Sequence, residues 1–201
     1  TFVATSGFLT SRTVIDGGAG KDTLSLNLKG SVKNSPTVKN IENFSLTSYG
    51  DYSLNLGKAT ELEYILSQQS LGKITLNNLT DASTVFGFSG NGINSTILTS
   101  NDLGGSSDIL KLHLVEASNV SFQAPLGYEE IEIELIGSSS LSYLLANGVS
   151  TASVSGSGDL VIDLDFKDLN SFSSKSLNGK LIGGSLDPVS YTHLRAHETR
   201  I

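Results

Sequence analysis

Apolar and polar residues alternate with a period of two along most of the chain. The clearest segments are 23–28, 73–79, 108–115, 129–136 and 159–166. Such alternation is the signature of strands with one face in a core and the other in water. The positions expected to face the core are Leu24, Leu26, Leu28, Ile74, Leu76, Leu110, Leu112, Leu114, Ile131, Ile133, Leu135, Leu160, Ile162, Leu164 and Phe166. The sequence therefore predicts an all-β fold.

Short segments rich in Gly, Asn, Asp and Ser separate these strands, as at 89–92, 137–140 and 155–159. These are the residues that turns favour. The only stretch with a helical pattern, 58–66, is short and lies between two strand signals. We interpret it as a turn followed by a strand.

Four pairs of segments repeat at an offset of about 86 residues. The pairs are 16–28 with 102–114, 40–46 with 128–135, 71–76 with 157–162, and 89–93 with 176–181. Repeats of short strands with glycine-bearing turns favour a parallel β-solenoid, of β-helix or β-roll type. An antiparallel β-sandwich is the alternative, because its strands have similar spacing. We expect one module over 1–100 and a similar one over 101–188.

The last thirteen residues, 189–201, differ from the rest in composition. Over 189–199 they resemble a translation of a common transposase-type sequencing adapter, so we expect a non-native tail there, with a genuine amphipathic helix as the alternative. On this view His193 and His197 are not a metal pair. The chain also starts with Thr1 and contains no Met. We expect it to be a fragment whose signal sequences lie elsewhere.

The chain is acidic, with a formal net charge of −7, and it contains no cysteine. Negative charge disfavours binding to nucleic acids and anionic membranes, and it suits divalent cations. The lack of cysteine excludes disulfides, zinc–thiolate sites and thiol nucleophiles. No apolar run is long enough for a transmembrane helix.

The segment 17–25, GGAGKDTLS, fits the nonapeptide G-G-x-G-x-D-x-U-x at every specified position. It resembles the RTX calcium repeat. Glycines let backbone carbonyls turn inward, and an Asp supplies a hard oxygen ligand for Ca²⁺. The resemblance implies Ca²⁺ bound near Asp16, Gly18, Gly20 and Asp22. It also implies that one turn gives only half a site, which a neighbouring turn must complete.

A second, weaker copy spans 102–110, with Asp102 and Asp108 in the corresponding positions. Ser106 replaces one glycine of the pattern. We expect Asp102 and Asp108 to be further calcium ligands. For both copies the alternative is a simple turn, in which Asp bonds its own backbone.

Over most of 13–187 the chain is similar to surface-layer (S-layer) and RTX-type proteins of Gram-negative bacteria. The likeness rests on segments 17–26, 38–46, 156–162 and 169–181. It implies type I secretion, calcium-driven folding outside the cell, and assembly with copies or neighbouring repeats of the same chain. We expect a calcium-stabilised structural module at the bacterial surface. The alternative is an adhesin or carbohydrate-binding or carbohydrate-cleaving β-helix, whose partner would be a cell-surface glycan.

Carboxylates that could serve catalysis line two strands, Glu130, Glu132 and Glu134 on one and Asp163 and Asp165 on the other. Paired carboxylates can hydrolyse glycosides. Alternation with Ile and Leu places these acids on the solvent face, so we expect a solvated ladder and no enzyme. The single histidine before the tail, at position 113, falls on a polar face with no catalytic partner at a recognisable spacing.

Overall fold

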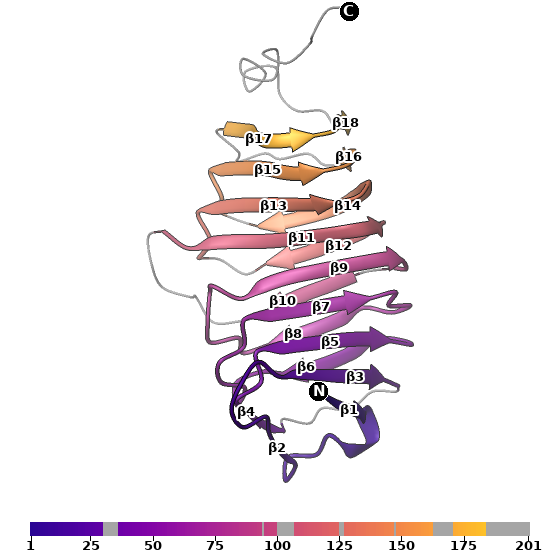
Figure 1. Ribbon diagram of the computed structural model, residues 1–201, viewed down its shortest axis with the longest axis vertical. Helices are drawn as coiled ribbons and strands as arrows, with labels where there is room; N and C mark the ends of the chain where they lie inside the picture. Colours follow the sequence, from indigo (N-terminus) through magenta and orange to yellow (C-terminus); the bar gives the residue numbers. More distant parts are fainter. Residues whose placement is uncertain are drawn as a thin grey trace, which may run out of the picture.

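The chain forms a β-solenoid of about seven turns, in which parallel strands stack in successive coils (Figure 1). The computed structural model describes residues 1–29, 36–93, 95–99, 107–124, 127–146, 148–162 and 171–183. Every strand pair in these ranges is parallel. The predicted solenoid is therefore confirmed, and the antiparallel sandwich is wrong.

Two long sheets face each other across the core. In the described residues, sheet 1 comprises β1 (Phe2–Thr5), β3 (Thr23–Leu28), β5 (Asn43–Ser48), β7 (Tyr64–Gln68), β9 (Val85–Asn91), β11 (Ile109–Ser118), β13 (Glu130–Ile136), β15 (Thr151–Ser157) and β17 (Ser171–Asn178). Sheet 2 comprises β6 (Tyr52–Asn55), β8 (Ile74–Asn77), β10 (Ser95–Thr99), β12 (Val120–Ala124), β14 (Ser139–Ala146), β16 (Leu160–Ile162) and β18 (Leu181–Gly183).

A small third sheet and one helical turn lie at the N-terminal end. The third sheet pairs β2 (Val14–Asp16) with β4 (Thr37–Lys39), and the 3₁₀ turn η1 covers Ser6–Phe8. The turn-plus-strand interpretation of 58–66 is confirmed, because β7 begins at Tyr64 after a turn. In the part of the chain described, no helix has the length and apolar character needed to cross a membrane.

The structural repeat is a single coil. Phe44 pairs with Ile65 and Ile65 pairs with Phe86, a step of 21 residues each time. The offset of about 86 residues corresponds to four coils, since β3 and β11 are four strands apart in sheet 1. Both sheets continue across residue 100, where β9 pairs with β11 and β10 with β12. The two expected modules thus share their sheets.

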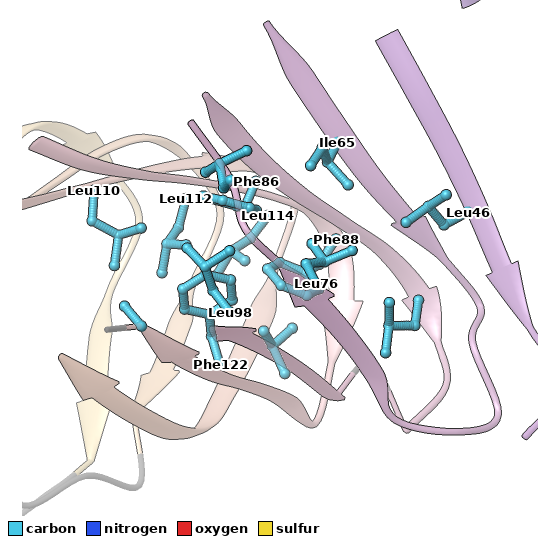
Figure 2. Packing of buried hydrophobic residues seen from close by; sticks show 14 of the residues in the cluster. Leu46, Ile65, Leu76, Phe86, Phe88, Leu98, Leu110, Leu112, Leu114 and Phe122 are labelled. Atoms are coloured by element: carbon cyan, nitrogen blue, oxygen red, sulfur yellow. The ribbon is translucent and has the colours of Figure 1, made fainter. Parts of the chain in front are cut away.

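Leucine, isoleucine and phenylalanine side chains fill the space between the two sheets (Figure 2). The predicted core positions that the structure describes are all buried, and Leu164 and Phe166 lie outside the described residues. Phe122 of β12 packs against Phe86 and Phe88 of β9, with ring centroids 5.0 and 5.9 Å apart. These rings tie sheet 2 to sheet 1 at mid-stack.

Candidate metal site at the acidic corner

Acidic residues recur at one edge of the solenoid, directly before strands of sheet 1. They are Asp22 before β3, Glu42 before β5, Glu63 before β7, Asp108 before β11 and Glu129 before β13. We call this edge the acidic corner; it lies on the left in Figure 1. Because successive coils are about 4.8 Å apart, acids in adjacent coils approach one another closely.

The same backbone turn precedes most of these acids. A residue with positive φ lies two positions before the acid. The residue between them has a buried side chain before Glu42, Glu63 and Glu129, but an exposed one before Asp22. The positive-φ residues of this kind are Gly20 (107°), Asn40 (52°), Glu61 (66°) and Gly127 (111°). Only glycine adopts such angles without strain. Gly20 of the nonapeptide is thus one instance of a turn that the fold repeats.

Asp16 and Gly18 form a local turn. Asp16 Oδ1 accepts hydrogen bonds from the Gly18 N–H (3.0 Å) and from Asn40 Nδ2 (2.7 Å). The bond from Asn40, and then that from Gly18, lowers the pKa of the Asp16 carboxyl. Gly18 has a φ of 81°. One oxygen of Asp16 is therefore already used by the turn, which matches the alternative interpretation of this segment.

Asp22 lies instead beside a second acid. Its N–H donates to Glu42 Oε2 at 2.7 Å, and its carbonyl accepts from the Asn43 N–H at 3.1 Å. Glu42 is only 9% exposed. The Asp22 side chain itself is only partly buried, with 17% of its surface exposed.

The weaker copy repeats this pair four coils further along. The Asp108 N–H donates to Glu129 Oε2 at 2.7 Å, and the Asp108 carbonyl accepts from the Glu129 N–H at 3.0 Å. Here, however, Asp108 Oδ2 is buried and has no hydrogen-bond partner. Asp102 lies outside the described residues. The sequence did not single out Glu42 and Glu129, although their segments matched each other in the repeat.

Tyr128 adds a second unsatisfied oxygen near Asp108. Its side chain is 1% exposed, and its hydroxyl has no hydrogen-bond partner. Burial raises the pKa of Tyr128, and the negative charge of Asp108 raises it further. An unpaired buried polar group costs roughly 1–3 kcal/mol, so the pair is a local source of instability.

The raised pKa predicts alkaline sensitivity. The buried, neutral Tyr128 hydroxyl contributes fully to the free energy of unfolding below the pKa of the unfolded state, about 10. This contribution is lost as the pH rises through the higher pKa of the folded state. Tyr128→Phe removes this titration, so urea unfolding of the variant should lose less stability between pH 9 and pH 11 than the parent. Tyr49→Phe, at a 53% exposed ring, is the control. Equal losses in parent and Tyr128→Phe would contradict the assignment.

A cluster on the outer face of sheet 1 was missed from the sequence. His113 Nδ1 lies 3.0 Å from the Tyr64 hydroxyl, two strands away. Gly87 lies between them, where a Cβ would come within 2.1 Å of that hydroxyl. Burial, and then the charge of Glu134, raises the pKa of Tyr64. The only sequence signal was a glycine at an outward strand position, and this pairing gives His113 a structural role.

The outer acids Glu130, Glu132 and Glu134 lie on the solvent side of β13, as expected. Asp163 and Asp165 fall outside the described residues.

The acidic corner fits a hard cation at one place best. Within the described residues, no three His, Asp or Glu side chains gather into a metal cluster. Asp108 nevertheless offers a buried, unpartnered carboxylate oxygen, and the carboxylate of Glu129 accepts the hydrogen bond of the Asp108 N–H. Oxygen donors of this kind are those Ca²⁺ prefers, and backbone carbonyls or water would have to complete the six to eight ligands. No protein-family model, curated protein or solved structure matches the chain, so its function has to be inferred from these contacts.

Proposed function

We propose that this chain is a calcium-stabilised structural module of a secreted bacterial surface protein, of the S-layer or RTX adhesin type. The observation that carries the calcium part is the buried, unpartnered Oδ2 of Asp108 next to Glu129. The surface and secretion parts rest on the nonapeptide and on the resemblance to those families.

The energetic reason is electrostatic. Two carboxylates in one partly buried site repel each other, and burial without a counter-charge is unfavourable. A divalent cation that binds only the folded state removes this penalty and stabilises the fold by linkage. A solenoid coil gains further because the metal joins two successive turns. Low free Ca²⁺ in the cytosol would then leave the chain less stable before export than after it.

Thermal unfolding with CaCl₂ and with EDTA tests the proposal. With a dissociation constant of about 0.1–1 mM, 10 mM Ca²⁺ should raise Tm by about 3–10 °C. Asp108→Asn should abolish most of this rise, and it should also raise Tm in EDTA because it removes an uncompensated charge. The matched control is Asp51→Asn, since Asp51 is exposed and accepts one backbone hydrogen bond.

Two results would reject the calcium part: identical melting with and without Ca²⁺, or a full Ca²⁺ response in Asp108→Asn. Equal shifts with Mg²⁺ would reject calcium selectivity. The assembly state of the protein distinguishes a structural lattice module from the alternative function as an adhesin. Calcium-dependent growth of ordered sheets, followed by electron microscopy, supports a lattice module, whereas a monomer that binds glycans supports an adhesin.

A further inference from the structure

An open hollow of about 680 Å³ lies at the edge opposite the acidic corner, where strands of sheet 1 end. We call it the corner hollow. The described residues that line it are Gln69, Gly90, Asn91, Glu116 and Ser138. They come from four successive coils, so the hollow runs along the solenoid axis. Its surface is open to solvent and mainly polar.

The backbone is strained in this hollow. Gln69 has a φ of 44° and Glu116 a φ of 46°. This is an unusual region for residues other than glycine. Such conformations cost about 1 kcal/mol or more. A positive φ recurs at Gly90 and Gly137 in the following coils, so this too is a turn that the fold repeats. The register of β11 against β9 also shifts between Val115 and Ser118, next to Glu116. Bulges of this kind re-aim side chains.

Glycines in the next coil make room for both strained side chains. A Cβ on Gly90 would lie 2.6 Å from Gln69 Cγ, and a Cβ on Gly137 would lie 2.5 Å from Glu116 Cγ. Ser118 Oγ donates to Asn91 Oδ1 at 2.9 Å, which orients the Asn91 amide. The hollow is therefore a built arrangement of two carboxamides, one carboxylate and one hydroxyl.

The chemistry of the lining excludes several ligand classes. No Lys or Arg is among the five residues, so the hollow does not fit phosphate, nucleic acid or an acidic polysaccharide. The polar side chains do not fit a lipid or an apolar helix. One carboxylate is too few for a strong Ca²⁺ site. Carboxamides that both donate and accept hydrogen bonds, together with a carboxylate that accepts them, fit a ligand rich in neutral hydroxyl groups.

We propose that the corner hollow binds a neutral saccharide chain. The coil spacing of about 4.8 Å is close to the advance of one pyranose unit in an extended glycan, so successive coils meet successive sugars. Glu116, Gln69 and Asn91 bind the hydroxyl groups. The proposal is independent of calcium at Asp108.

The strained backbone allows a test that does not damage the fold. Gln69→Gly and Glu116→Gly relieve the positive φ, so each variant should be as stable as the parent or more stable. Binding of cello-, chito-, malto- and mannohexaose is measured by titration with NMR detection. At least one of these hexasaccharides should bind the parent protein. Gln69→Gly and Glu116→Gly should each raise its dissociation constant at least 10-fold. Glu61→Gly is the matched control, because Glu61 also has a positive φ but lies at the acidic corner.

The proposal is overturned if no neutral hexasaccharide binds, if Glu116→Gly binds as the parent does, or if Glu61→Gly weakens binding equally. It is also overturned if polygalacturonate binds in preference to the neutral glycans, or if CaCl₂ alone shifts the resonances of the hollow and no glycan does. Thermal unfolding of Glu116→Gly with CaCl₂ separates this site from the proposed calcium site. The Glu116→Gly variant should show the same rise in Tm with CaCl₂ as the parent. A smaller rise would show that the two sites are not independent.

Discussion

Replacing Phe122 by alanine should lower the free energy of unfolding by about 3–5 kcal/mol. The ring is fully buried and contacts two phenylalanines of the opposite sheet, so the change leaves a cavity at the centre of the stack. Loss of the aromatic contacts adds to the effect, by about 0.5–1.5 kcal/mol. Urea unfolding followed by circular dichroism measures the change.

The same variant should also unfold less cooperatively. Each coil of a solenoid contacts only its neighbours, so a weak central coil lets the two ends unfold separately. A broader transition with a smaller m-value is therefore expected. Ser121→Ala, on the outward side of the same strand, should change stability by less than about 0.5 kcal/mol. A loss below about 1 kcal/mol in Phe122→Ala would show that the core repacks around the missing ring.

Gly158→Ala should destabilise the chain by about 2–5 kcal/mol, without removing any contact. Gly158 has a φ of 115°, and an added Cβ would lie 2.3 Å from the carbonyl carbon of Gly137 in the preceding coil. The conformational strain costs about 1–3 kcal/mol and the forced separation of two coils a similar amount. Thermal and urea unfolding would both report the loss.

Gly50→Ala provides the comparison, because nothing lies within 4 Å of an added Cβ there and its φ is not positive. This substitution should be neutral or slightly stabilising. If both alanine variants were equally stable, the close approach of Gly158 to Gly137 would not hold in solution.

The sequence predicted the strands because alternation is a local pattern, and it predicted the parallel stacking from segments that repeat along the chain with glycine-bearing turns. Leu110, Leu112 and Leu114 alternate with polar residues, and a strand has only two faces. The length of one coil was not predicted. Its repeating turn requires a positive φ and not a particular residue, so Asn40, Glu61 and Gly127 serve the same purpose with no shared identity. The sequence showed only the repeat at an offset of four coils, because the residues of the turns are alike at that spacing.

The candidate site was predicted in part for a similar reason. Asp22 and Asp108 stand out because they lie in glycine-rich turns. Their acid partners, Glu42 and Glu129, come from the following coil, and their placement depends on the strand register. The contact between Tyr64 and His113 spans 49 residues and requires Gly87 between them. No local pattern reports such a contact.

The step of about 21 residues in most coils has a mechanical consequence. The hydrogen bonds between coils lie along the solenoid axis, so a force that pulls the two ends apart loads them one coil at a time. The stack would then peel open at low force and lengthen in increments of about 70 Å, the extended length of one coil. The stack would absorb a pull by lengthening in this way and would close again afterwards.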